Sequence, residues 1–190
     1  MAHPPATSRT AMREVRRTAI VPYTPQQMYA IVNDVRRYPE FVPWCPATRV
    51  HAETETSIEA TVDVQRSGVR LSLTTRNSMR PGELIELSLV DGPLRTLEGS
   101  WRFEPILERA TPVGNAAATS APVAGDPSEP GADAPPAPRV RGCRVELEVR
   151  FDFKSAALTV LFGPVFEASW DSLVDAFVVR ARALHGTARA

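Results

Sequence analysis

Apolar and polar residues alternate one by one along much of the chain, and this alternation limits the possible folds more than any other feature. Residues 57–66, SIEATVDVQR, set Ile58 and Val62 against Glu59 and Asp63. Neighbouring side chains of a strand point to opposite faces of a sheet, so the pattern predicts strands with one apolar and one polar face. It recurs in 67–76, 85–89, 97–103 and 144–153, and more weakly in 13–21 and 47–54. The sequence therefore predicts an antiparallel sheet of six to seven strands.

The apolar face of such a sheet needs a cover, and the end of the chain supplies an amphipathic helix. Residues 157–186 carry a stripe at spacings of three and four, which lies on one face of a helix. Gly163-Pro164 is expected to kink this helix or to mark its start, and Gly186 to end it. The stripe consists of Phe162, Phe166, Ser169, Leu173, Phe177, Arg180 and Leu184. The expected fold class is α+β, with a curved antiparallel sheet around one long C-terminal helix.

The segment DVRRYPEFVPWCP, residues 34–46, combines aromatic residues with three prolines. It follows a shorter predicted helix that Thr24 caps and Pro25 begins. The prolines predict that the segment is neither a regular helix nor a strand. Two interpretations stay open: the apolar side chains form a lid over one end of a cavity, or they plug the end of the core. These side chains are Tyr38, Phe41, Val42 and Trp44.

Two segments are expected to be disordered, the tail 1–11 and the stretch 106–139. The second consists mainly of Ala, Pro, Gly, Ser and Thr, and it buries too little apolar surface to offset the entropy of ordering it. It lies between two predicted strands, where a long insertion costs little additional closure entropy. A linker between two domains is the alternative, but the roughly fifty residues beyond it are few for a separate domain. Residues 12–186 are therefore predicted to form a single domain.

Composition excludes several kinds of function. The formal net charge is zero, which gives no overall electrostatic case for binding DNA. Cys45 and Cys143 share no ligand spacing with the three histidines, so we expect no metal site and two free thiols. No nucleophile elbow or glycine-rich phosphate loop occurs, and we expect no enzymatic activity. Without an apolar leader or a stretch of about 18 apolar residues, the expected location is the cytoplasm, with peripheral contact at the inner face of the cytoplasmic membrane.

Two separated motifs resemble one known family. YAIVNDVRRYPEFVPWCPATRV, residues 29–50, and FGPVFEASWDSLVDAFVVRARALHG, residues 162–186, are similar to the coenzyme Q-binding START-like family of the SRPBCC superfamily, which includes bacterial RatA proteins. The resemblance implies a helix-grip fold that encloses a hydrophobic tunnel. It also implies binding of a polyprenyl quinone such as ubiquinone, as a carrier that supports respiration without a required cofactor. For RatA-type members it implies a toxin that binds the large ribosomal subunit and blocks subunit joining.

If the resemblance holds, the apolar lid, the apolar face of the sheet and the helix stripe line the tunnel. An isoprenoid tail suits such walls, because each buried CH2 contributes about 0.8 kcal/mol without any hydrogen bond. Arg180, on or beside the apolar part of the stripe, is expected to meet a quinone carbonyl or a carboxylate, or to extend into solvent. The predicted ligand-binding residues are Tyr38, Phe41, Val42, Trp44, Leu71, Leu73, Leu87, Leu97, Trp101, Phe162, Phe166, Leu173 and Phe177.

If the protein instead binds the ribosome, two clusters of arginines are the candidate binding surface. Amphipathic Trp44 and Tyr38 are candidates for transient contact with a membrane surface. The alternative to an anionic binding partner is that these arginines pair with acidic neighbours such as Glu14 and Asp34. The clusters are Arg13, Arg16 and Arg17, and Arg36 and Arg37.

Overall fold

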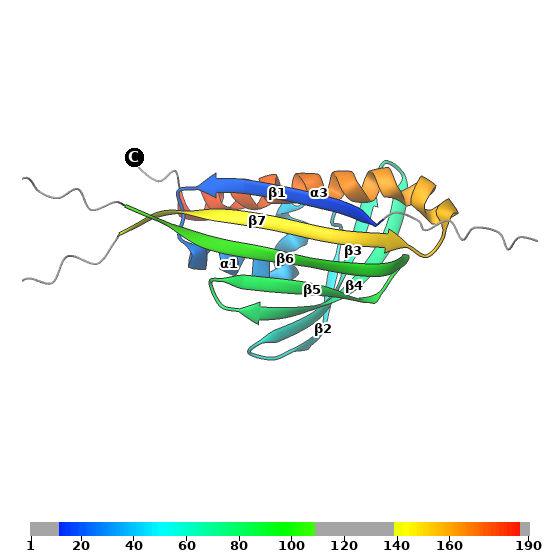
Figure 1. Cartoon of the computed structure of the whole chain (residues 1–190), viewed down its shortest axis with the longest axis horizontal. Helices are drawn as coiled ribbons and strands as arrows, with labels where there is room; N and C mark the ends of the chain where they lie inside the picture. Colours follow the sequence, from blue (N-terminus) through cyan, green and yellow to red (C-terminus); the bar gives the residue numbers. More distant parts are fainter. Residues whose placement is uncertain (1–11, 109–138, 187–190) are drawn as a thin grey trace, which may run out of the picture.

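The computed structural model describes residues 12–108 and 139–186, which form a seven-stranded antiparallel sheet and a long C-terminal helix (Figure 1). The strand order is β1-β7-β6-β5-β4-β3-β2. This arrangement confirms the fold class expected from the sequence. The strands are β1 Arg13–Val21, β2 Thr48–Glu53, β3 Ser57–Arg66, β4 Val69–Arg80, β5 Leu84–Asp91, β6 Leu94–Leu107 and β7 Val140–Phe153. The helices are α1 Pro25–Asn33, the 3-10 turn η1 Val35–Arg37, α2 Tyr38–Phe41 and α3 Ala156–His185.

The alternating residues form the strands because one face of the sheet is buried. In β3, Ile58, Ala60 and Val64 are buried, while Glu59 and Asp63 lie on the outer face. Glu59 accepts from Arg76 at 2.8 Å, and Asp63 is held by Arg49 and Ser72, which lower the pKa of its carboxyl group. These acids thus lie on the solvent-facing side of the sheet, as their alternation predicted, and there they pair with arginines.

Both sides of the curved sheet are joined to α3. Arg17 of β1 forms an ion pair with Asp171 at 2.7 Å, and Arg66 at the end of β3 donates to the Ala168 carbonyl oxygen at 2.8 Å. Strands that are far apart in the sheet order therefore contact neighbouring turns of the same helix. The apolar face of the sheet lies inside this wrap, and α1 shares the space beside α3.

Helix α3 begins at Ala156, before Gly163-Pro164, whereas the start of the helix was one of the two interpretations of that pair. Ser155 caps it, accepting from the Leu158 backbone N–H at 3.3 Å, so the interpretation of Gly163-Pro164 as the start is wrong. Pro164 lies inside the helix on its exposed side, where the carbonyl that loses a partner can bond to water. Gly186 ends the helix with a φ of 73°, as expected.

The start of α1 follows the sequence prediction. The Thr24 side chain accepts from the Gln27 backbone N–H at 3.2 Å, and the Gln27 side chain accepts from the Thr24 N–H at 2.8 Å. This reciprocal capping box satisfies two donors that the first helical turn leaves free.

The segment 34–46 is more regular than predicted, since η1 and α2 both lie in it. The prediction that it holds no helix is therefore wrong over residues 35–41. Pro39 occupies the first turn of α2, where its missing N–H has no partner to lose and its fixed φ suits the helix.

The long connection between β6 and β7 begins later than the composition suggested. Ile106 and Leu107 belong to β6, and Leu107 pairs with Val140 of β7. Most of the predicted insertion, 109–138, and the predicted tail 1–11 lie outside the described residues, where disorder stays a prediction.

Cys45 and Cys143 are both free and buried, as expected for two unpaired thiols. Burial raises the pKa of each thiol to about 11 from an ordinary value of 9.0. Between about pH 9 and pH 11, the folded protein therefore keeps both thiols protonated, whereas the thiols of the unfolded chain have lost their protons.

We expect neither thiol to react with Ellman's reagent at pH 8 in the native protein, and both to react in denaturant, because only exposed thiolate attacks the reagent.

The same raised pKa values predict that the free energy of unfolding falls as the pH rises from about 9 to about 11. Urea titrations at several pH values measure this fall. Rapid labelling of the native protein at pH 8 would contradict the burial described.

Candidate functional site

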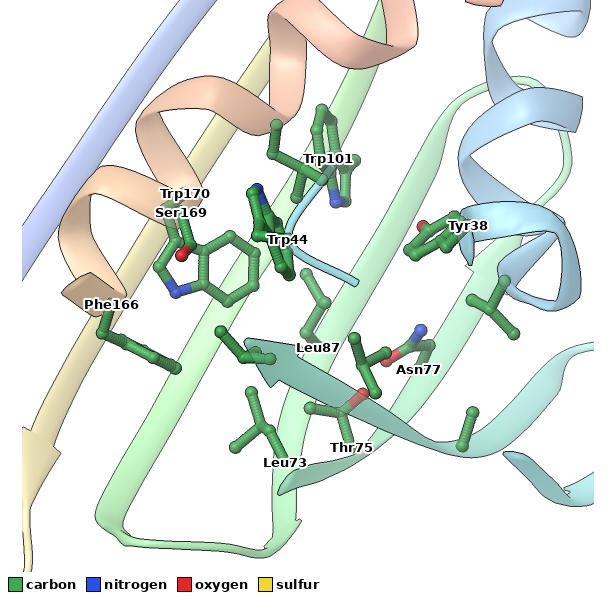
Figure 2. A pocket seen from close by; sticks show the side chains of 15 residues that line it. Tyr38, Trp44, Leu73, Thr75, Asn77, Leu87, Trp101, Phe166, Ser169 and Trp170 are labelled. Atoms are coloured by element: carbon green, nitrogen blue, oxygen red, sulfur yellow. The ribbon is translucent and has the colours of Figure 1, made fainter. Parts of the chain in front are cut away.

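A cavity lies between the sheet and the middle of α3 (Figure 2). The centre of a water-sized sphere can occupy about 60 Å³ of this cavity. The unoccupied volume is about 630 Å³ when the solvent at the open mouth is included. A cavity of about 10–15 Å³ by the first measure holds one water, so this interior is partly hollow.

The cavity walls come from four parts of the chain: the 35–44 segment, β3, the central strands β4 to β6, and α3. Their residues are mostly aliphatic or aromatic, with three small polar side chains among them, and none carries a formal charge. Such walls suit a neutral and largely apolar molecule. The lining residues are Val35, Tyr38, Trp44, Ala60, Val62, Val64, Leu73, Thr75, Asn77, Leu87, Trp101, Phe166, Ser169, Trp170 and Leu173.

Tyr38 and Trp44 lie over the cavity, and their polar atoms are bonded to the protein. The Tyr38 hydroxyl donates to the Val32 carbonyl oxygen at 2.6 Å, and the Trp44 indole Nε1 donates to Ser172 Oγ at 3.0 Å. Each residue is 8% exposed, and burial raises the pKa of the Tyr38 hydroxyl. A membrane contact through these rings would require them to leave these positions.

Phe41 packs outside the cavity. Its ring meets Phe177 edge-on at 5.5 Å, and the Arg180 guanidinium lies 5.2 Å from the ring centroid. Arg180 also forms an ion pair with Glu40 at 2.6 Å, so it meets a carboxylate, one of the partners expected from the sequence. This arrangement fixes α2 against α3 at the surface, beside the cavity rather than in it.

The structure brings together part of the predicted ligand-binding set. The predicted residues that line the cavity are Tyr38, Trp44, Leu73, Leu87, Trp101, Phe166 and Leu173. The predicted residues that lie outside its walls are Phe41, Val42, Leu71, Leu97, Phe162 and Phe177. Among the latter, Val42, Leu97 and Phe177 are buried in the core. A periodic pattern identifies the apolar face of a strand or helix, but not the part of that face that stays uncovered. Ligand binding by any of them stays a prediction.

Several residues that line the cavity were not among the predicted ligand-binding residues, although their spacing in the sequence could have indicated them. Thr75 and Asn77 continue the buried face of β4 two and four residues beyond Leu73, but polar side chains do not mark an apolar face. Trp170 follows Phe166 by four residues, which is the helical spacing of the stripe, and its ring packs edge-on against Phe166 at 5.9 Å.

The two arginine clusters are extensively ion-paired. Arg17 pairs with Asp171, Arg36 with Glu53 at 2.6 Å, and Arg37 with Asp34 at 3.4 Å. The pairing account of these arginines is therefore confirmed for the side chains described. Arg13 and Arg16 have acidic partners as well, namely Glu167 for the first, and Glu14 and Glu148 for the second.

Within residues 12–108 and 139–186, no three His, Cys, Asp or Glu side chains gather closely enough to hold a metal ion. No helix in these same ranges is long and apolar enough to span a bilayer.

Comparison with known proteins agrees with the fold. A family model described as polyketide cyclase / dehydrase and lipid transport matches residues 21–178, a stretch that contains every cavity residue. The chain belongs to this family. The polyketide cyclase and lipid transport family includes both enzymes and carriers by its description, so membership alone does not choose between them.

Two relatives of this chain have names that describe association or binding. The Ribosome association toxin RatA of Vibrio cholerae is 35% identical over 175 residues, 92% of this chain and 99% of the relative. The mitochondrial Coenzyme Q-binding protein COQ10 of Drosophila melanogaster is 24% identical and covers 88% of this chain and 57% of its own length. A START superfamily protein from Mycobacterium smegmatis shares the fold, with a TM-score of 0.62, 15% identity, and 90% and 98% coverage. The predicted resemblance is confirmed.

Replacing Ser172 tests the contact that holds Trp44 over the cavity. Ser172 Oγ accepts from Trp44 and, at 3.2 Å, from Arg66. Ser172→Ala leaves a buried indole N–H unpaired, so we expect the free energy of unfolding to fall by about 1–3 kcal/mol. Ser78→Ala, on the exposed face of β4, is the control and should change it by less than about 0.5 kcal/mol. Equal effects of the two substitutions in urea titrations would contradict this role.

Proposed function

We propose that this protein is a non-enzymatic carrier that holds a polyprenyl quinone in the cavity beneath α3. The observation that carries the proposal is a partly hollow and uncharged cavity with mostly apolar walls, in a family whose description includes lipid transport. The name of the Coenzyme Q-binding relative supports a quinone as the ligand.

The walls suit the two parts of such a ligand. Aromatic rings of Tyr38, Trp44, Trp101 and Trp170 surround the free space and can contact a ligand ring edge-on or face to face. The aliphatic side chains of β3 can contact an isoprenoid tail, which gains about 0.8 kcal/mol for each CH2 it buries. Since the enclosed space is small, the first isoprene units should supply most of the affinity and the rest of the tail should lie in the mouth.

The same walls give no support to catalysis. General acid-base chemistry needs a titratable group within reach of the substrate, and among the cavity residues the Tyr38 hydroxyl is the candidate. That hydroxyl already donates to Val32, and its raised pKa keeps it protonated. Binding without chemistry is therefore the function that this geometry supports best.

Filling the cavity should weaken binding while the fold persists. Ala60 is buried on β3 and lines the cavity, so Ala60→Leu places three more carbons where the ligand would lie. We expect affinity for a ubiquinone with a short tail to fall about 30-fold, equivalent to about 2 kcal/mol of lost apolar burial. Calorimetric titration of the full chain measures the change.

Ala52→Leu on β2 is the matched control, since Ala52 is exposed and lies outside the cavity. It should bind the quinone as the parent protein does. Unfolding curves of both variants separate a filled cavity from a damaged fold. Unchanged affinity in a folded Ala60→Leu variant would remove the cavity from the proposal.

Association with the large ribosomal subunit is the second candidate function. The observation that favours it is the 35% identity to the Vibrio cholerae RatA protein over almost the full length of both chains. The candidate surface is at Arg36 and Arg37 in η1, which lies beside β2 at the edge of the sheet. Neither arginine lines the cavity, so the two functions would use separate surfaces.

The double variant Arg36→Gln/Arg37→Gln should weaken association with large ribosomal subunits by about 5- to 30-fold, because two exposed charge contacts contribute up to about 1 kcal/mol each. Quinone binding should not change. Arg80→Gln/Arg102→Gln removes the same charge from exposed strand positions and serves as the control. Co-sedimentation at low salt is the measurement, and equal sedimentation of the two double variants would exclude this surface.

A further inference from the structure

One polar atom in the cavity wall has no partner. The Asn77 side-chain oxygen, Oδ1, is fully buried and accepts no hydrogen bond from the residues that the structure describes. Asn77 lies on β4 between Ile58 of β3 and Leu87 of β5, and it is 7% exposed. Figure 2 shows its amide on the cavity side of the sheet, next to Thr75.

Three other polar side chains of the cavity wall are bonded to the protein. The Ser169 hydroxyl donates to the Val165 carbonyl oxygen at 2.8 Å. Tyr38 and Trp44 donate to Val32 and Ser172, as described above. Asn77, which also lines the cavity, therefore differs from these three neighbours in having a buried acceptor that no described residue bonds. Asn33 Oδ1 is also buried without a partner, but Asn33 does not line the cavity.

A free acceptor in such a place is costly for the fold and useful for a ligand. Burying an amide oxygen without a partner costs about 1–3 kcal/mol, and a ligand that donates to it recovers much of that cost. The donor has to be neutral, because no acidic side chain lines the cavity to balance a cation. A hydroxyl group on an otherwise apolar molecule meets both requirements.

We propose that Asn77 selects a ligand with a ring hydroxyl, so that the cavity takes the reduced, hydroquinone form of its quinone in preference to the oxidised form. The oxidised ring carries carbonyl groups, which only accept hydrogen bonds, whereas the reduced ring carries hydroxyl groups that donate to Asn77 Oδ1. This inference rests on the proposed quinone-carrier function and adds the redox form that is carried. It concerns binding alone and involves no electron transfer.

The experiment compares the reduced and oxidised forms of a ubiquinone with one isoprene unit, titrated anaerobically into the full chain. The parent protein should bind the reduced form about 2- to 10-fold more tightly, the difference that one net hydrogen bond provides. Asn77→Leu should remove the preference by weakening binding of the reduced form. The same variant, without ligand, should be at least as stable as the parent protein in urea, since it removes an unpaired buried amide.

Asn33→Leu is the matched control, because it replaces the other unpaired amide outside the cavity and should leave the preference unchanged. Equal or tighter binding of the oxidised form by the parent protein would overturn the inference while leaving the carrier function intact. So would a preference that survives in Asn77→Leu. Binding of neither form would overturn the inference together with the carrier function. If Asn77→Leu does not fold, the ratio of the two affinities in the parent protein decides.

Discussion

The structure depends on a mismatch between the apolar face of the sheet and the helix that covers it. Seven strands curve around α3, but one helix about 10 Å wide cannot cover their whole inner face. The remaining area is covered by α1 and by the segment from η1 to Trp44. The cavity lies where these covers meet, with Tyr38 and Trp44 on one side and Phe166 to Leu173 of α3 on the other. A cavity in this fold is thus a consequence of its geometry.

The contacts that hold the covers together also decide how freely the cavity can open. Ser172 joins α3 to Trp44 and to Arg66 at the end of β3. Glu40 and Phe41 join α2 to Arg180 at the surface. These contacts use a few polar groups and exposed charges, whereas the core beneath them is packed aromatic rings. The segment 34–46 also buries Val35, Tyr38 and Val42 in this core, so opening the cavity at this side would expose these side chains.

Much of the fold could be predicted because it follows from local rules. Alternation defined the bounds of β3, and a threonine followed by a proline defined the start of α1. The two motifs in 29–50 and 162–186 led to the correct family. The start of α3 was ambiguous because a proline in an exposed turn costs less than the pattern assumes, and the Ser155 cap decides instead.

The site was harder to predict because it depends on which parts of the buried face stay uncovered. Phe177 and Leu97 have the same pattern as Trp101 and Leu173, yet neighbouring rings and strands fill the space around the first pair. Asn77 carries the most specific chemistry of the wall, but a polar residue within an alternating strand gives no sign of its direction. Such residues become visible only when the sheet and helix are placed together.

The central claim is that the hollow beneath α3 holds a quinone when the protein is folded. Organic extraction of the purified, unwashed full chain followed by mass spectrometry tests it directly. We expect recovery of a polyprenyl quinone approaching one molecule per chain. Protein that yields no quinone, and that instead co-sediments with large ribosomal subunits, would contradict it.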